Sequence, residues 1–384
     1  MSTLSIYLPP FSPDYSGAAS ALYELGGMII LHDASGCTGN VLGYDEPRWV
    51  EAASSRALVY CSAYRHLEAI LGQDDLVVDR IVRAAESLKP KFIALIGSPV
   101  PMLVGTDYEG IAKELEAKTG IPSFGFDTKG LDFYDKGYQK ATIDLIKRYA
   151  KKKETISGTV NLIGLTPIDF GAMGNDKAIL SLLKEAGISV LCSFSMNFSL
   201  EDVRQSGNAA LNVVLSEGGY GVACYMKESF GIPFITSVPF GDGKDFLDEI
   251  RNALALRSVK KPYNTLKEGK KVLIIGEQVA SSSLRDILEK RGVKADVAIP
   301  FNYREELLKD KDYPFVTEKD IRRIVNEGSY TDIVADPLIK SLITRENVNF
   351  HANPTVAISS KFHWDEIRCL IGRKMEDFIE EICS

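Results

Sequence analysis

Short apolar runs alternate with amphipathic stretches along almost the whole chain. Many of the runs end at a glycine or a polar residue, which is typical of buried strands. The stretches between them are about a dozen residues long and place apolar positions three and four apart, which predicts helices. Strands that alternate with such helices indicate parallel sheets with right-handed crossovers. We expect strands at 27–31, 92–97, 120–126, 159–165, 188–192, 209–215, 272–276, 297–299 and 332–336.

Between these strands we expect helices at 15–26, 75–87, 108–119, 176–186, 221–230, 281–291 and 318–327, and one that begins with a capping pattern at Ser199. Three of the apolar strands end alike, at Gly97, Gly164 and Gly276. This repetition predicts an α/β protein of three Rossmann-like, doubly wound domains with parallel sheets. The domains are expected at 1–155, 156–266 and 267–384. No G-x-G-x-x-G follows any of the three strands, so a dinucleotide cofactor is not expected.

Composition narrows the function classes. The 384 residues suit two or three domains, and 45% hydrophobic residues can supply their cores. A net charge of −7 provides no basic footprint for nucleic acid, and no apolar run is long enough to span a membrane. The first ten residues lack the pattern of a signal peptide. Six cysteines are scattered without C-x-x-C pairs, which favours a reducing, cytoplasmic location.

Cys37 is the candidate that bears most directly on function. It follows the apolar run 27–31 and stands in the sequence His32-Asp33-Ala34-Ser35-Gly36-Cys37. This places it on the loop where a buried strand ends, with Gly36 and Gly39 leaving room for backbone N–H groups to approach the sulfur. On its own, a cysteine after a buried strand is more often a packed small hydrophobic residue.

The order small-residue helix, Gly-Gly, strand, His-x-x-x-Gly-Cys resembles the start of the nitrogenase component 1 family. Further stretches fall in the order of that family, at 71–73, 103–107, 199–203, 210–214, 230–233 and 239–241. The resemblance implies three Rossmann-like domains around a central cleft, like those of the nitrogenase molybdenum–iron protein. It also implies an iron–sulfur cluster that bridges two subunits, with Cys37 in the position of the middle of three cysteine ligands. A generic chelatase-like or binding-protein fold is the alternative.

Two of the three cysteines that the resemblance implies are missing. The first would fall near Ser12 to Asp14 and the third near Pro99. The cysteine that holds the catalytic metal cofactor of nitrogenase would fall at Ser216, whose hydroxyl is a poor ligand for iron–sulfide sites. Reduction of dinitrogen by such a cofactor is therefore not expected.

Cys61 is the second candidate ligand, because it follows another short apolar run in the same domain. In a two-fold dimer, Cys37 and Cys61 from each copy would supply the four thiolates of a 4Fe–4S cluster. The alternative for Cys61 is a buried cysteine at a strand end. Asp14, Asp33 and His32 are reserve ligands that are otherwise capping or turn residues, and Cys192, Cys224, Cys369 and Cys383 suit core or terminal positions.

We expect the homodimer to form through the first domain, where the small residues 17–21 would permit close helix approach; a homologous subunit is the other candidate partner. Ligands of open parallel sheets bind beyond the carboxyl ends of the strands. The polar residues expected there are Ser98, Thr166, Ser193, Ser216 and Glu277.

Two function classes remain. One is an oxidoreductase component that takes low-potential electrons from a separate ATP-dependent iron–sulfur reductase, since this chain has no G-x-x-x-x-G-K-[ST]. It would reduce a small organic substrate, with a tetrapyrrole as one candidate class. The other is a non-catalytic binding, carrier or scaffold protein of the same fold without the cluster. The sequence does not identify the substrate.

Overall fold

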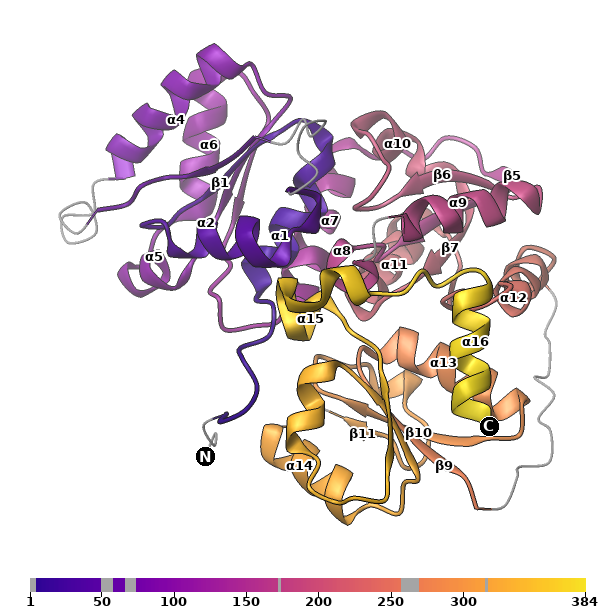
Figure 1. Cartoon of the computed structure of the whole chain (residues 1–384). Coiled ribbons are helices and arrows are strands. Elements are labelled where there is room, and N and C mark those ends of the chain that lie inside the picture. Colours follow the sequence, from indigo (N-terminus) through magenta and orange to yellow (C-terminus); the bar gives the residue numbers. More distant parts are fainter. Residues whose placement is uncertain (1–4, 50–57, 66–73, 172–173, 257–268, 315–316) are drawn as a thin grey trace.

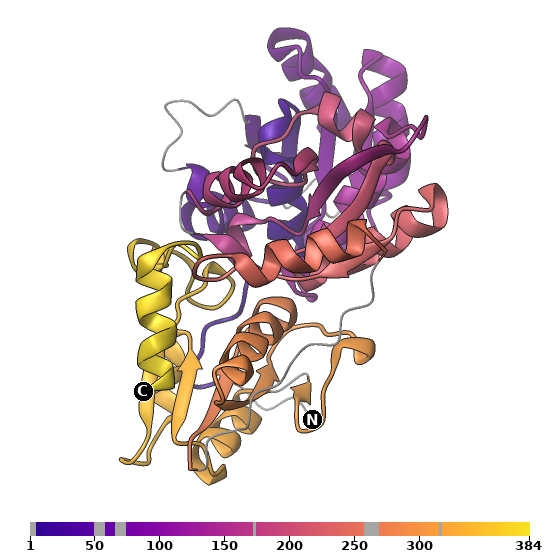
Figure 2. The ribbon, with the colours of Figure 1, turned by 90° about the vertical axis from the view of Figure 1, so that its right-hand side faces the viewer.

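A computed structural model describes residues 5–49, 58–65, 74–171, 174–256, 269–314 and 317–384. These residues form three parallel sheets, which lie in three parts of the molecule (Figure 1). A view turned by 90° shows the third sheet below the other two, with the C-terminal helix beside it (Figure 2). The expected α/β fold with three Rossmann-like units is confirmed. None of the described helices is both long and apolar enough to cross a membrane.

The first sheet has the order β2-β1-β3-β4. All residues of β1 and β3 are buried, as expected for central parallel strands covered by helices on both faces. Leu31 pairs with Cys61 on one side and with Ile96 on the other, so these three strands end at one level. The strands are β1 (Met28–Leu31), β2 (Leu58–Cys61), β3 (Ile93–Ile96) and β4 (Ser123–Phe126). The helices are α1 (Asp14–Leu22), α2 (Gly36–Asn40), α4 (Asp74–Leu88), α5 (Pro99–Val104), α6 (Tyr108–Thr119) and α7 (Tyr134–Tyr149).

The second sheet has the order β6-β5-β7-β8. The capping pattern expected at Ser199 is confirmed, because Ser199 and Asp202 form a reciprocal capping box at the start of α10. The strands are β5 (Ile156–Ile163), β6 (Ser189–Ser193), β7 (Ala209–Val214) and β8 (Phe234–Thr236). The helices are α8 (Pro167–Phe170), α9 (Asn175–Glu185), α10 (Leu200–Gln205), α11 (Glu217–Phe230) and α12 (Lys244–Leu254).

The third sheet has the order β11-β10-β9-β12-β13. Its central strand β9 is buried from Val272 to Ile275 and leads directly into α13, whose N-cap is Glu277. The strands are β9 (Lys271–Ile275), β10 (Lys294–Ile299), β11 (Tyr313–Pro314), β12 (Asp332–Ala335) and β13 (Asn349–Ala352). The helices are α13 (Gln278–Lys290), α14 (Glu318–Glu327), α15 (Val356–Ser359) and α16 (Arg373–Cys383).

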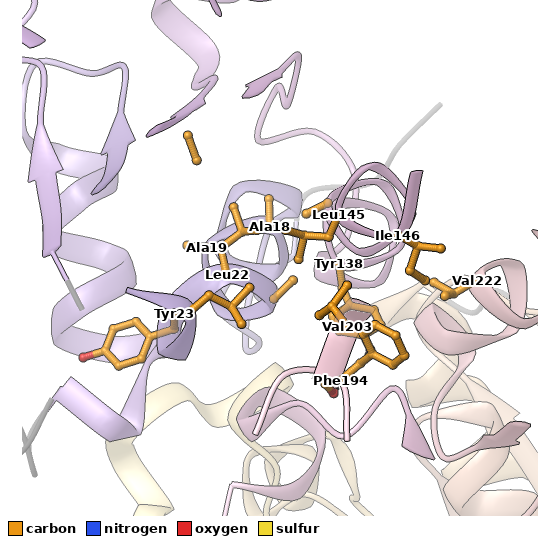
Figure 3. Packing of buried hydrophobic residues seen from close by; sticks show 14 of the residues in the cluster. Ala18, Ala19, Leu22, Tyr23, Tyr138, Leu145, Ile146, Phe194, Val203 and Val222 are labelled. Atoms are coloured by element: carbon orange, nitrogen blue, oxygen red, sulfur yellow. Dashed lines mark hydrogen bonds between the residues drawn. The ribbon is translucent and has the colours of Figure 1, made fainter. Parts of the chain in front are cut away.

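The small residues of α1 pack inside the chain. Every residue of α1 is buried, and the helix lies against α7, which in turn contacts α11 of the second unit (Figure 3). A Cβ atom at Gly17 would stand 1.8 Å from the carbonyl oxygen of Tyr134, and one at Gly137 would stand 1.7 Å from that of Asp14. The expectation that residues 17–21 serve a dimer contact is therefore wrong, because α7 of the same chain occupies their surface.

Segments at both ends of the chain cross between the three units. The backbone N–H groups of Ile6, Tyr7 and Leu8 donate to the Glu318 carboxylate of α14. After β13 the chain returns to the second unit, where Gly372 donates to the carbonyl of Gly241 at 2.7 Å. The expected boundary after residue 155 coincides with the start of β5. The boundary after residue 266 lies outside the described residues, and the division into three domains stays a prediction.

Candidate functional site

The two candidate cysteines lie on neighbouring segments at the carboxyl edge of the first sheet. Cys61 is the last residue of β2, and its thiol donates to the carbonyl of Asp33 at 3.1 Å. Cys37 lies in the first turn of the short helix α2, and not on the open loop that the sequence suggested. The helix forms there because the Asp33 carboxylate accepts the N–H groups of Ser35 at 2.9 Å and Cys37 at 2.7 Å. Asp33 thus connects the segments that carry both cysteines.

The Cys37 thiol is half-buried between two hydroxyl groups, those of Tyr15 from α1 and Ser98 from the start of α5. Burial raises the pKa of this thiol, and the nearby Asp33 carboxylate raises it further, while the hydroxyl hydrogen bonds lower it. The pKa of Tyr15 is raised too, chiefly by burial. Without a metal, the site therefore holds a neutral thiol, and a bound metal ion would have to displace its proton.

The three chain positions at which the family resemblance places cysteines meet at this point. Tyr15 follows Asp14, and Ser98 precedes Pro99, so both missing positions adjoin Cys37. Asp14 is already engaged, because its carboxylate accepts the N–H groups of Lys129 at 2.8 Å and Gly130 at 2.7 Å. Pro99 begins α5 and has no donor atom in its side chain. Only the middle position keeps a sulfur ligand.

The reserve ligands named from the sequence have structural roles. Asp14 and Asp33 cap backbone N–H groups, and His32 is fully buried with its Nδ1 atom 3.0 Å from the Ser62 hydroxyl. No group of three or more histidine, cysteine or acidic residues in the described parts of the chain is placed to hold a metal ion. The donor set of one chain thus amounts to two thiols, Cys37 and Cys61. A four-thiolate site would need two further thiols from a second copy or a homologous chain.

Of the remaining cysteines, Cys192 and Cys383 take the core or terminal positions that the sequence suggested, whereas Cys224 and Cys369 do not belong to a core of the described residues. Cys192 is buried in the core between the first and second sheets, and Cys383 packs against the core below α16. Cys224 lies within α11, and Cys369 lies just ahead of α16; both are partly exposed.

A second candidate region is a cavity of about 60 Å³ at the carboxyl ends of strands from the second and third sheets. Glu277 lines it as expected, since it follows β9. Ser98 and Ser193 do not line it, because Ser98 donates to the carbonyl of His32 and Ser193 to that of Met196. The cavity is lined by Tyr134, Asp169, Phe170, Asn175, Phe240, Ile274, Ile275, Gly276, Glu277, Ala280, Ser281, Leu284, Phe301, Asn353, Pro354, Thr355, Ala357, Ile367, Arg368 and Leu370.

Asp169 is the main residue of this cavity that the sequence analysis missed. It accepts hydrogen bonds from the hydroxyls of Tyr134 and Thr166, the latter at 2.8 Å, and Ser216 lies beside it as well. Thr166 and Ser216 therefore support Asp169 and are not among the lining residues. The signal was present in the sequence, because Thr166-Pro167 after a strand predicts a helix start, and an acid at the third helical position completes it.

Four acidic side chains from four helix starts meet next to the cavity. We refer to Asp135, Asp169, Glu217 and Glu277 as the carboxyl cluster. Burial raises the pKa of Asp169 to about 7, that of Asp135 to about 7 and that of Glu277 to about 8. Charge repulsion adds to burial, from Glu217 on Asp135 and from Asp169 on Glu277. Buried acids of this kind keep their protons near neutral pH, which is the property of general acids in enzymes.

At least three larger pockets lie elsewhere among the described residues, one of them about 410 Å³ and located between the ends of α4 and α6. One of about 270 Å³ separates α12 from α13, and one of about 650 Å³ follows the edge strand β4 between α6 and α7. The latter is lined mainly by charged side chains from both helices. None of these pockets is lined by an acid with a raised pKa, and none lies at the carboxyl ends of strands from two sheets. The cavity beside Asp169 and Glu277 is therefore the stronger candidate for chemistry.

Comparison with known proteins gives a consistent picture. The chain resembles one of the subunits of the light-independent protochlorophyllide reductase of Chlorobium limicola, at 25% identity over 284 residues, which cover 69% of this chain and 50% of that protein. It also resembles the nitrogenase iron-molybdenum cofactor biosynthesis protein NifE of Clostridium pasteurianum, at 27% identity over 196 residues, covering 50% and 42%. The chain thus spans half or less of the length of these curated relatives.

A solved structure of nitrogenase Cp1 at pH 6.5 has the same fold, with a TM-score of 0.74 and 13% identity over 100% of this chain and 94% of that one. The model of the family described as nitrogenase component 1 type oxidoreductase matches residues 13–336, which include both cysteines and the whole carboxyl cluster. The chain belongs to the nitrogenase component 1 type oxidoreductase family.

Proposed function

We propose that this protein is a nitrogenase-like oxidoreductase component that receives low-potential electrons and reduces a small organic substrate. The electron donor is a separate ATP-dependent iron–sulfur reductase, as in the family resemblance. The observation that carries the proposal is that Cys37 lies where the three family ligand positions converge, while Cys61 ends the neighbouring strand at the same sheet edge and both are hydrogen-bonded to Asp33.

Cys37 and Cys61 are the thiolates that would hold a 4Fe–4S cluster, two from each of two subunits. Such a cluster would supply one-electron transfer between the external reductase and the interior of the protein. The role of the chain is to fix the two sulfur atoms. Asp33 does this from one side, since it accepts the N–H of Cys37 and its carbonyl accepts the thiol of Cys61.

Apolar side chains surround the cysteine edge and support a subunit contact there. In α5, which begins beside Cys37, Leu103 is 79% exposed, and Val100 and Val104 are each 48% exposed. Leu131, in the loop after β4, is 75% exposed. Exposed apolar residues gathered on one surface are typical of a protein–protein interface. We propose that a second copy of this chain, or a homologous subunit, covers them.

Iron and sulfide analysis after anaerobic purification tests the proposal. We expect the wild-type protein to contain iron and acid-labile sulfide and to absorb in the visible range. Cys37→Ser should lose the iron but keep the fold, because exchange of sulfur for oxygen changes little volume. Cys224→Ser is the matched control, since Cys224 lies on α11 away from the first sheet; it should keep its full iron content.

A carrier or scaffold function is the second candidate. It is favoured because two of the three positions that hold cysteines in the family, near Asp14 and near Pro99, hold no cysteine in this chain. Wild-type protein that contains no iron after cluster reconstitution would support this second function. Full iron retention in Cys37→Ser would reject Cys37 as a ligand.

A further inference from the structure

We propose that the carboxyl cluster is the proton donor for the reduction of a small unsaturated molecule bound in the central cavity. The inference rests on the proposed function, because the electrons come from the external iron–sulfur reductase. Neither the comparisons nor the family description assigns a role to these four acids. Three observations carry the proposal: how the acids are held, how few positive charges face them, and what the adjoining cavity can contain.

Each acid is held by the start of a helix. Asp169 lies in α8 and accepts a hydrogen bond from the hydroxyl of Tyr134, the first residue of α7. Glu277 caps α13 and accepts the N–H groups of Val279 at 3.0 Å and Ala280 at 2.8 Å. It also accepts the N–H of Glu217 at 2.7 Å, which joins it to the start of α11. The three sheets thus contribute to one network.

The remaining pair of acids lies behind the first. The Asp135 carboxyl accepts the Asn302 amide at 2.7 Å through Oδ1, whereas its Oδ2 atom is buried without a hydrogen-bond partner among the described residues. Asp135 is only 2% exposed. Glu217 faces it and forms an ion pair with Arg304 at 2.6 Å. A buried carboxyl oxygen without a partner, next to a second carboxyl, is placed to share a proton.

The charge balance also requires bound protons. Four ionised carboxylates would face the Arg304 guanidinium, the only cation in an ion pair with the cluster among the described residues, and the Lys136 ammonium next to Asp135. The backbone N–H groups around Glu277 favour its charged form, but burial opposes four charges together. The protons held near neutral pH therefore belong to Asp135, Asp169 and Glu277, the three acids that burial protonates.

The cavity limits the substrate. A volume of about 60 Å³ holds about two water molecules, or a ligand with about three non-hydrogen atoms. Asp169 presents a hydrogen-bond donor to it when the acid is protonated, whereas the Tyr134 hydroxyl donates to Asp169 itself. Phe170, Phe240 and Phe301 supply apolar walls. The fitting class is a small molecule with a C=N, C=O or C≡N bond whose heteroatom accepts a hydrogen bond; a tetrapyrrole does not fit this space.

The chemistry balances with two protons and two electrons. A substrate bond X=Y gains two electrons from the iron–sulfur reductase and becomes HX–YH. The first proton passes from Asp169, and the second follows from Asp135 behind it, so the π bond breaks while two new bonds to hydrogen form. The acids are left ionised and take up two protons from water, and Arg304, which is partly exposed, lies on the route to solvent.

Infrared titration tests the protonation without any turnover. The carboxyl C=O band of protonated acids should persist at neutral pH in the intact protein and disappear as the pH rises toward about 9. Asp169→Asn and Asp135→Asn should each remove part of that band. Asp127→Asn is the matched control, because its side chain is 58% exposed, and should leave the band unchanged.

Acetonitrile tests the cavity, because its nitrile band shifts when the nitrogen accepts a hydrogen bond. We expect bound acetonitrile to show the shifted band at pH 6 and to lose it at about pH 9, when the acids ionise. In Asp169→Asn the band should no longer change with pH. Absence of a protonated carboxyl band at neutral pH, or a nitrile band in the wild-type protein that does not respond to pH, would overturn the proposal.

These readouts are separate from the iron analysis. Protein that holds iron but shows only ionised carboxylates would leave the proposed function intact and reject the proton donor. Protein that shows protonated Asp169 and Asp135 but never binds iron would reject the electron supply, and with it the role of the carboxyl cluster in a reduction.

Discussion

At the scale of single residues, two glycines set the distance between α1 and α7. Gly17 lies against the backbone of Tyr134, and Gly137 lies against that of Asp14. Tyr134 and Asp135 begin α7 and belong to the network of the central cavity, so the contact also positions catalytic candidates. A side chain larger than hydrogen at either position would push the two helices apart, because the atoms it meets are backbone atoms that cannot rotate away.

We therefore expect Gly17→Ala to lower the free energy of unfolding by about 3 kcal/mol. Urea denaturation followed by circular dichroism measures the change. Gly39→Ala is the matched control, since nothing lies within 4 Å of a Cβ at that position in α2. That control should leave stability unchanged or raise it by up to about 1 kcal/mol. Equal losses in both variants would contradict the packing argument.

The raised carboxyl pKa values also make stability depend on pH. Asp169 has a pKa of about 7 in the folded protein and an ordinary value of 3.8, so between these values the folded state binds more protons than the unfolded state. Stability must then fall as the pH rises through that window, by about 1.4 kcal/mol per pH unit for each proton retained. Below the window both states are protonated, and above it both are ionised.

We expect Asp169→Asn to reduce this fall, because an amide carries no proton that the folded state must retain. The free energy of unfolding, measured in urea between about pH 5 and pH 8, should decline less steeply than in the wild-type protein. Asp127→Asn, at an exposed carboxyl, should keep the wild-type slope. A slope that is identical in all three proteins would show that Asp169 is already ionised at pH 5.

The sequence predicted the positions of residues at the ends of strands better than the roles of residues in the first turns of helices. Cys61 and Glu277 were placed correctly at the carboxyl edges of their sheets, because an apolar strand fixes the position of the next residues. Asp169 and Asp135 were missed because each lies inside a helix start, where an acid is usually only a capping residue. Their role depends on a second helix from elsewhere in the chain, which local sequence does not reveal.

At the scale of elements, α16 joins the second and third units. Its Glu376 carboxylate accepts the Arg291 guanidinium at 2.6 Å and the N–H of Asp242 at 3.0 Å. Its apolar face is buried in the core that spans both sheets, with Ile379 and Ile382 fully covered. The helix lies beyond the residues that match the family model, yet it covers the core beneath the cavity.

Ile379→Ala should therefore cost about 2–5 kcal/mol of unfolding free energy, because it leaves a void in a core shared by two sheets. The change is measured by urea denaturation. Glu380→Ala, one residue along on the exposed face, is the control and should change stability by less than about 0.5 kcal/mol. A small effect of Ile379→Ala would mean that α16 is not part of the cooperative core.

The elements that the apolar pattern predicted are present. Two elements that it did not predict are β13 and α16. Strand β13 was not expected, because Asn349 and His351 interrupt its apolar character. The polar residues are tolerated since Asp332 of β12 bonds to His351 Nε2 at 2.9 Å. Helix α16 was also not named, although its apolar positions 375, 378, 379 and 382 have helical spacing.

At the scale of the whole molecule, connections between distant parts of the chain matter more than the three sequential units. The N-terminal segment reaches α14, and Ser12 donates to the carbonyl of Ala357 in α15 at 3.0 Å. Both chain ends therefore hold the third unit against the other two. The walls of the central cavity come from all three units, so the cavity depends on this closure.

Cys37 and Cys61, by contrast, are partly exposed and would supply only two of the four thiolates of the proposed cluster, so the proposed electron transfer requires assembly. We expect a homodimer in which α5 of each copy lies near the two-fold axis. Leu103→Glu should produce a monomer, because a charge on this 79% exposed side chain would have to be buried at the interface. Light scattering at micromolar concentration measures the mass.

Leu256→Glu is the matched control, since Leu256 is 88% exposed at the end of α12 in the second unit. It should remain a dimer with wild-type iron content, whereas the Leu103→Glu monomer should lose its iron together with its partner. Loss of both properties in one variant would link the cluster to the interface, because no single chain supplies four thiolates at that edge. A wild-type protein that is monomeric yet binds iron fully would instead require all ligands to come from one chain, which the described residues around Cys37 and Cys61 do not provide.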